Sequence, residues 1–579
     1  MTDIPSAQPA EAPPTQPAGR ALFVRQSSGL VREVSVRNAL FFNAAAFIGA
    51  GIGWYPVFYA LPFIAVGMLG PFSTYGLAAI ITGVFCILVG LIYASLSTVM
   101  PRSGGDYVFT SRFIPKAGPF IAWVESFTLV FASLAIIAFE VPIVLRNLQI
   151  SGRIVGIGTG NTFMASANGW FTNSSGSIVG WQGLGGSLIV LLVIFWVVIQ
   201  PTRRFHRIVT VLAILGLACA AVMCVVGLLL VHPAQVVTGL EKFAHTTPTA
   251  LAKVAKADGT LGSGVSFAPD VFALMVGVLL FQYIGFQYSS YIAGEVRGNV
   301  KKSILIAVIG ALILGVFMNS VYVDLLSGSF GFGGQVGWGT LFWLGSTHLP
   351  LGQPNSMPLV AAIAQPGVWP IWLIVSLGSM LFPFLLCPVY INFISRVSLA
   401  WSLDRQVPEW FGVVSERLRA PINSIMVALG ISVVLVILEN FPLLPRSITQ
   451  TGYLNLESTA WFAIVMLALT WIMPGINAIV ARFSRPDLIR NAPFRRWLIP
   501  IGVVWAVFAL VVYYFAGALP IWKSLTTPHV NAAAYLRDTG LTFSIGIVVF
   551  ALVYYVIRAS INRMRGIDTQ LLYQEIPPD

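Results

Sequence analysis

The chain has 579 residues but only 33 basic and 21 acidic side chains, whereas a soluble domain of this length carries about 145 charged residues. Hydrophobic residues make up 57% of the sequence and the mean hydropathy is +0.84, so apolar side chains must fill uninterrupted stretches. These values exclude an ordinary soluble protein, and we expect an all-α polytopic membrane protein.

The net charge of +12 does not indicate a nucleic-acid partner, because the Lys and Arg residues are scattered in short segments between apolar runs. The four cysteines lie inside apolar stretches without CxxC spacing, which excludes a disulfide framework and a zinc site. They are Cys86, Cys219, Cys224 and Cys387. We expect neither a metal nor another cofactor.

Twelve candidate spans follow the first 37 residues, each near the ~20 residues that a bilayer requires. Residues 1–20 hold five prolines and four alanines, so we expect 1–37 to be a disordered or interfacial N-terminus rather than a signal peptide. The predicted spans are about 38–65, 73–98, 118–148, 184–200, 207–231, 268–293, 303–326, 368–403, 421–439, 449–473, 498–519 and 538–559.

The positive charges are distributed unequally between the two sides of the predicted membrane. With a cytoplasmic N-terminus, 25 bases fall in inner segments and 8 in outer ones, as the positive-inside rule requires. The outer bases are Arg146, Arg153, Lys242, Lys253, Lys256, Arg446, Lys523 and Arg537. We therefore expect both termini in the cytoplasm, a C-tail over 560–579, and inner loops that bind anionic lipid of the cell membrane.

Two spans are interrupted by glycine and polar residues at similar depth. The first contains Gly49, Gly51 and Gly53, each of which costs a helix interior about 1 kcal/mol relative to alanine, and the sixth reads Gln282 to Gln287. A single glycine-rich span is also typical of close helix packing in lipid. The occurrence of both predicts that helices one and six open.

Interruptions at positions one and six divide the first ten spans into two sets of five. An odd number of spans per set forces opposite orientations, so we expect an inverted repeat of 38–231 and 268–473, followed by two extra helices in 498–559. The inner segment Tyr107 to Gly118 and the outer segment Met357 to Gly367 have similar lengths and corresponding places. Because unwound backbone in a bilayer is tolerated where a solute replaces its hydrogen bonds, this arrangement indicates a carrier.

Three ordered motifs support this interpretation. The first runs from Met100 to Tyr107 and on to Trp123, the second from Gly285 to Arg297, and the third from Ser395 through Asp404 to Pro421. Together they resemble the amino acid, polyamine and organocation (APC) transporters, which share the five-plus-five inverted-repeat fold of bacterial leucine transporters.

The resemblance implies a site for an α-amino acid backbone. In the first span, backbone N–H groups without helical partners at the end of a half-helix suit a carboxylate. In the sixth span, carbonyl groups without helical partners suit an ammonium. The implied substrate-binding residues are Ala50, Gly51, Ile52, Gly53, Phe281, Gln282, Tyr283, Ile284 and Gly285. An inner gate is expected from charged segments that pair in one state and separate in another, namely Pro101, Arg102, Gly104, Gly105, Tyr107, Arg396 and Asp404.

Several positions depart from the family pattern and bear on the coupling ion. Gln287 replaces a frequent glutamate, Gly216 stands where some proton-coupled members hold a buried lysine, and Leu386-Cys387-Pro388 lacks the paired hydroxyls of sodium-coupled relatives. We therefore expect a proton or no coupling ion rather than sodium.

Glu125 is the main candidate for a coupling group. An ionisable group at mid-bilayer costs at least ~2.5 kcal/mol and needs a partner, a proton or a function. We expect it to titrate or to pair with a cationic substrate, and the alternative is a structural hydrogen bond. The other intramembrane acids are Glu140, Asp324, Glu439 and Glu457.

The resulting prediction is a secondary active transporter that moves amino acids or related amines by alternating access. The alternative is a transporter-fold nutrient sensor or a channel-like facilitator. An intramembrane enzyme is excluded because the histidines are expected in loops or at span ends, at His206, His232, His245, His348 and His529. The residues do not determine which amino acid or amine is carried, or whether the protein works by uptake or by exchange. They also leave open the oligomeric state and the role of the long outer segments 149–183 and 232–267.

Overall fold

The computed structural model describes residues 30–49, 68–69, 72–165, 169–172, 178–247, 282–322, 324–326, 357–440, 466–519 and 541–567, together with isolated positions that include Tyr573. Within this part of the chain, the structure is helical apart from β1 (Met68–Leu69) and β2 (Phe72–Ser73), which pair antiparallel.

Seven helical segments are long and apolar enough to cross a membrane among the described residues. They are Tyr75–Val99, Gly118–Thr159, Gly180–Val198, Thr202–Leu230, Val300–Leu326, Pro366–Leu403 and Ser544–Met564. Two shorter apolar helices, Ile422–Leu438 and Leu498–Tyr513, match the predicted spans nine and eleven. The described chain is thus a polytopic helical membrane protein, as the composition predicts.

The first half of the chain provides α1 to α9. Their bounds are α1 Val36–Gly49, α3 Thr74–Val99, α4 Asp106–Phe113, α5 Gly118–Thr159, α6 Thr162–Ala165, α7 Gly180–Val198, α8 Thr202–Leu230 and α9 Pro233–Ala244.

The second half provides shorter and more broken helices. They are η2 Tyr288–Tyr291, η3 Ala293–Glu295, α12 Val300–Phe317, the π-helix η4 Met318–Tyr322, α15 Met357–Ala364, η5 Pro366–Val368, α16 Trp369–Ser379, α17 Leu381–Leu403, η6 Glu409–Gly412, α18 Ile422–Asn440, α21 Ala468–Ser484, α22 Pro486–Ile489, α23 Leu498–Tyr513, the π-helix η7 Tyr514–Ala518 and α26 Leu541–Met564.

The predicted end of the third span at residue 148 is wrong. Helix α5 is 42 residues long in all, runs through Pro142 and ends at Thr159. The next residue, Gly160, has a left-handed φ of 72°. Arg153, predicted for an outer loop, lies inside this helix and donates from Nε to the carbonyl oxygen of Ala165 at 3.2 Å. The glycine and serine residues of this segment led to the prediction of a loop. Packing against α6 and α16 keeps the segment helical in spite of this composition.

Other boundaries shift as well. Helix α21 continues past the predicted end at 473 to Ser484, and α9 occupies part of the outer segment 232–267. His206, expected at a span end, is buried inside α8 between the rings of Phe42 and Phe205.

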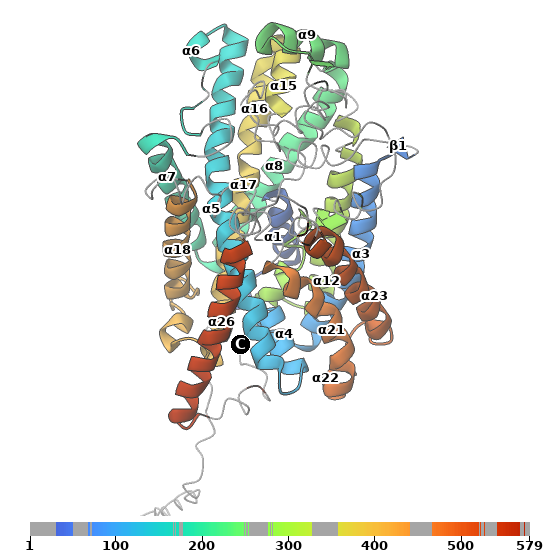
Figure 1. The fold of residues 1–579 in the computed structure, drawn as a ribbon, viewed down its shortest axis with the longest axis vertical. Helices are drawn as coiled ribbons and strands as arrows, with labels where there is room; N and C mark the ends of the chain where they lie inside the picture. The colour runs from blue at the N-terminus through green and yellow to red at the C-terminus, as the bar shows by residue number, and fades with distance from the viewer. Residues whose placement is uncertain are drawn as a thin grey trace, which may run out of the picture.

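Helix α1 lies in the middle of the bundle and packs against α8, α12 and α17 (Figure 1). Helices α5 and α17 are largely buried, whereas α7, α8, α23 and α26 present large apolar side chains outward. Leu192 on α7 and Val225 on α8 are 62% and 57% exposed, which suits contact with lipid rather than water.

Two short helices occupy matching positions at opposite ends of the molecule. Helix α4 precedes α5 at one end, and α15 precedes α16 at the other (Figure 1). The sequence predicts paired connectors at Tyr107 to Gly118 and at Met357 to Gly367; α4 begins one residue before the first of these segments, and α15 lies within the second. This placement is the relation that an inverted repeat requires.

Candidate substrate site and inner gate

The sixth span is interrupted as predicted. Residues Tyr283 to Gln287 form turns rather than a continuous α-helix, and the 3-10 helices η2 and η3 follow. Gly285 has a φ of 104°, and a Cβ at this position would overlap the Cβ of Ala46 on α1. Only glycine allows this conformation and approach together.

Side-chain hydrogen bonds support the opened turn. Gln287 Oε1 accepts from the backbone N–H of Gly285 at 3.2 Å. Asn43 Nδ2 on α1 donates to Ser289 Oγ at 3.0 Å, and the N–H of Ser289 donates to Asn43 Oδ1 at 2.7 Å. Helix α1 is thereby fixed against the broken segment, in an interior that supplies partners for polar groups.

The predicted substrate-binding residues divide into two groups. Gln282, Tyr283, Ile284 and Gly285 lie in or beside the interruption and are buried. Ala50, Gly51, Ile52, Gly53 and Phe281 lie outside the described residues, as does Glu457.

The side chains of Gln282 and Tyr283 contact α3. Tyr75 donates its hydroxyl to Gln282 Oε1 at 3.1 Å, and the Tyr283 hydroxyl donates to the carbonyl of Ala79 at 3.0 Å. Both side chains are thereby held against α3.

The predicted inner-gate segments meet in the structure. Gly104 and Gly105 both have left-handed φ angles, 117° and 52°, and the N–H of Gly104 donates to the carbonyl of Tyr291 at 3.0 Å. A Cβ on Gly104 would come within 2.8 Å of Ala400 on α17, and one on Gly105 within 2.6 Å of the Tyr291 ring. The glycine pair lets residues 100–105, the gate loop, pack between η2 and α17.

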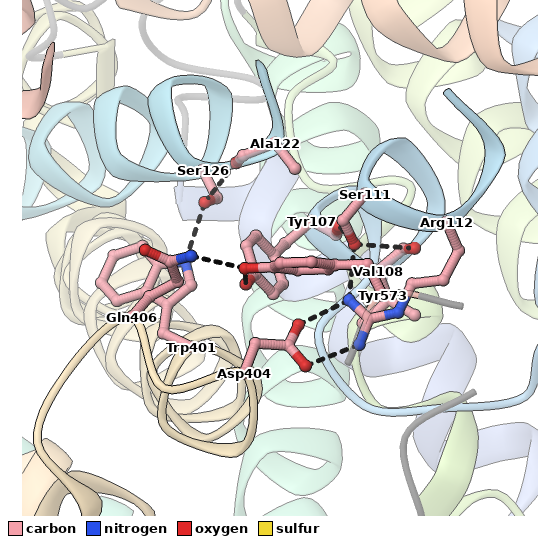
Figure 2. A network of polar contacts seen from close by, with 10 residues as sticks. All are labelled: Tyr107, Val108, Ser111, Arg112, Ala122, Ser126, Trp401, Asp404, Gln406 and Tyr573. Carbon is pink, nitrogen blue, oxygen red and sulfur yellow. Dashed lines mark hydrogen bonds and ion pairs between the residues drawn. The ribbon is translucent and has the colours of Figure 1, made fainter. Parts of the chain in front are cut away.

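Two buried ion pairs connect these elements. Arg112 on α4 donates to Asp404 through two hydrogen bonds of 2.5 and 2.6 Å (Figure 2). Arg396 on α17 donates to Glu295 through bonds of 2.9 and 3.0 Å. Both pairs have the bidentate geometry that makes arginine–carboxylate contacts strong.

Arg112 and Glu295 were not predicted as gate residues. Their ion-pair partners, Asp404 and Arg396, were. Both lie within the quoted motifs, Arg112 in the segment after Tyr107 and Glu295 after the sixth span. The available signal was a charged residue close to a predicted span, since a buried charge requires a partner.

Tyr573 from the C-tail fills the space beside the first ion pair. Its hydroxyl accepts from Gln406 Nε2 at 2.5 Å and lies 3.5 Å from the Tyr107 hydroxyl, and the Arg112 guanidinium stands 5.1 Å from its ring centre (Figure 2). Nothing in the sequence predicted a role for Tyr573, because its neighbours in the tail form no apolar pattern.

Glu125 is fully buried in the second turn of α5, where it faces α4. Its Oε2 accepts from Thr110 Oγ1 at 2.6 Å, and Thr110 in turn accepts from Asn477 Nδ2 of α21 at 2.8 Å. Oε1 is buried without a hydrogen-bond partner. Glu125 therefore has neutral partners within the described chain.

Asp106, at the start of α4, is the second buried carboxyl of this region. Its Oδ2 accepts from Tyr291 at 2.5 Å and from Tyr93 at 3.0 Å, while Oδ1 is buried without a partner. Burial raises the pKa of Asp106 to about 7, and the hydrogen bonds from Tyr291 and Tyr93 lower it by less. Asp106 lies within the first motif, and the motif alone predicted no role for it.

Residues 39–536 match the family model described as amino acid permease. The chain belongs to the amino acid permease family. A curated relative, the aspartate-proton symporter of Bacillus subtilis (strain 168), is 22% identical over 457 residues, which cover 77% of this chain and 73% of the relative. The resemblance to APC transporters is thereby confirmed at the level of the family.

The positions where this permease departs from the family pattern are occupied by structural groups. Gln287 supports the turn at Gly285, and Gly216 on α8 faces Phe382, whose ring would lie 3.3 Å from an added Cβ. Among the described residues, no group of three His, Cys, Asp or Glu could hold a metal ion.

Proposed function

We propose that this permease is a secondary active transporter that moves an amino acid together with a proton by alternating access. The observation that carries the proposal is the interruption of the sixth span at Gly285, fixed to α1 through Ala46, Asn43 and Ser289. A break of this kind between two packed half-repeats offers backbone groups to a solute at the membrane centre.

The substrate class follows from the groups available there. Carbonyls of the turn from Phe281 to Gly285 bind the substrate ammonium, and N–H groups of Ala50 to Gly53 bind its carboxylate. Both ends of an α-amino acid are thus recognised without a charged side chain. The name of the bacterial relative makes aspartate the first substrate to test.

The gate works through the two buried ion pairs. When Arg112–Asp404 and Arg396–Glu295 are formed, the loop at Gly104, η3 and α17 are packed together and this end of the pathway is closed. Opening separates these elements, as charged gates do in alternating access. We place this end in the cytoplasm, with both termini, on the distribution of Lys and Arg.

The test is uptake into proteoliposomes. We expect radiolabelled aspartate or another amino acid to accumulate when an inward proton gradient is imposed, and a sodium gradient alone to have no effect. Gly51→Leu should abolish substrate binding without unfolding the protein, because the side chain blocks the approach of the carboxylate.

Different outcomes identify the competing functions. Flux that only equilibrates under every gradient would indicate a channel-like facilitator, and saturable binding without flux would indicate a sensor. Unchanged affinity in Gly51→Leu would contradict the assignment of the carboxylate site.

A further inference from the structure

We propose that Asp106 and Glu125 together form the binding site of the coupled proton, which they hold as a shared carboxyl pair. This inference rests on the proposed function, since a coupled proton presupposes a carrier. It adds a residue outside the transmembrane spans to the coupling machinery and places the proton beside the inner gate.

The two carboxyls come together on one face of α4. Asp106 and Thr110 are four residues apart on this helix, so their side chains are neighbours one turn from each other. Thr110 donates directly to Glu125 at 2.6 Å, which brings the carboxyl of α5 against the same face. Asp106 is 1% exposed and Glu125 is 0% exposed, so water does not solvate either group.

Neither carboxyl has a cationic partner within the described chain. The groups that face them are neutral: Tyr93 from α3, Tyr288 and Tyr291 from η2, Thr110 from α4 and Asn477 from α21. The basic residues of the adjoining elements, Arg112 and Arg396, donate to Asp404 and Glu295 instead. Two unpaired negative charges in a buried site are costly, and a proton removes one of them.

The hydrogen bonds also leave a place for this proton. Each carboxyl has one oxygen that accepts from hydroxyl donors and one buried oxygen without any partner, Oδ1 of Asp106 and Oε1 of Glu125. Thr110 uses its single hydrogen toward Glu125, because it accepts from Asn477 on its other side. The free oxygens are therefore the atoms available for protonation.

The pair is connected to the substrate site through Tyr291. Its hydroxyl donates to Asp106, its carbonyl accepts from Gly104 of the gate loop, and η2 follows the broken turn at Gly285 after Gln287. A hydrogen bond to a charged carboxylate is about twice as strong as one to a neutral acid. Binding of the proton thus weakens the hold of α4 on η2, and its release restores it.

Other buried titratable groups of the described chain include Glu140 and His206, and His206 is the one chosen for comparison. It lies on α8 against Phe42 and Phe205, without a hydrogen-bond partner for either ring nitrogen. It makes no hydrogen bond to Asp106 or Glu125, although the charge of Arg396 acts on it, and it serves as the control for a buried titratable group outside the carboxyl pair.

The first experiment measures coupling in proteoliposomes with Asp106→Asn, Glu125→Gln, the double variant and His206→Gln. A gradient of about one pH unit supports about tenfold accumulation when one proton is carried per substrate, because both correspond to about 1.4 kcal/mol. We expect this accumulation ratio in the wild type and in His206→Gln, and a ratio near one in both single variants. The double variant should be no worse than either single one, since the two groups share one proton.

Wild-type accumulation in both single variants, or its loss in His206→Gln alone, would overturn the proposal.

The second experiment does not depend on transport: the unfolding temperature in detergent is measured between about pH 4 and pH 8. The wild-type temperature should fall as pH rises toward 7, and the slope should flatten in Asp106→Asn and in Glu125→Gln. A slope that persists in both variants refutes the shared proton, whereas flattened slopes in a protein without amino acid flux refute only the proposed function.

Discussion

Arg112 and Asp404 face each other through two parallel hydrogen bonds of 2.5 and 2.6 Å, although 292 residues separate them in the sequence. Neither side chain is exposed to solvent. The pair joins α4 to the end of α17, and with Arg396–Glu295 it fixes the side of the molecule where the gate loop packs.

Removing one member of the first pair should be strongly destabilising. Arg112→Met leaves the Asp404 carboxylate buried without its cation, a change that costs about 3–5 kcal/mol. The double variant Arg112→Met, Asp404→Leu should recover much of this loss, because no buried charge remains. The unfolding temperature in detergent checks both expectations.

The exposed pair Arg485–Asp487 provides the control for this prediction. Its members are 25% and 61% exposed, and Asp487→Asn should change the unfolding temperature little, because solvent screens the interaction. Equal effects of Asp487→Asn and Arg112→Met would contradict the energetic argument.

Gly285→Ala should abolish transport and lower stability. The added Cβ overlaps Ala46, and the left-handed φ of 104° is unfavourable for any residue with a Cβ. Gly298→Ala is the matched variant, since Gly298 also has a positive φ, 71°, but an added Cβ meets no atom within 4 Å. Its cost should be limited to about 1–2 kcal/mol of backbone strain, with uptake kinetics close to wild type.

The sequence predicted the features that depend on local pattern. Apolar length predicted the long apolar helices of the described chain, and the polar residues around Gly285 predicted the interruption of the sixth span. The segment Tyr107 to Gly118 holds all of α4 except its first residue, Asp106, and Met357 to Gly367 contains α15, because connector length between two spans is visible in the sequence. Glu125 was identified as a candidate coupling group because burying an acid in an apolar span is costly.

The partners of these residues could not be predicted. Asp106 is bound by Tyr291, which is 185 residues away, and Asn477 is linked to Thr110 over 367 residues. Such contacts depend on how helices cross, which periodicity within one helix does not encode. The end of α5 was missed for the same reason, since its last turns are supported by α6 and α16 rather than by local propensity.

Tyr573 should contribute to stability chiefly through its ring. Tyr573→Phe keeps the aromatic face toward Arg112 and loses the hydrogen bond from Gln406, whereas Tyr573→Ala loses both. A cation–π contact with a desolvated arginine contributes up to about 2 kcal/mol, so the Ala variant should unfold at a clearly lower temperature than the Phe variant. Protease cleavage of the tail in detergent should also be faster in the Ala variant, and equal cleavage rates would show that the tail is held by other contacts.

The last prediction concerns Tyr291→Phe, which removes the 2.5 Å hydrogen bond to Asp106 Oδ2 without changing the ring. A donor to the charged carboxylate lowers its pKa, so the variant should raise the pKa of Asp106 above about 7. A carboxyl whose pKa is raised on folding contributes stability that is fully present below its ordinary pKa of ~3.9 and is lost as pH rises through the folded value. The fall of the unfolding temperature, and the pH midpoint of proton-driven uptake, should therefore both move to higher pH.

Tyr93→Phe should act in the same direction with a smaller shift, because its bond is longer at 3.0 Å. Tyr322→Phe is the control, since its buried hydroxyl has no hydrogen-bond partner in the described chain. A midpoint that stays in place or moves to lower pH in Tyr291→Phe would show that this tyrosine does not tune the carboxyl pair.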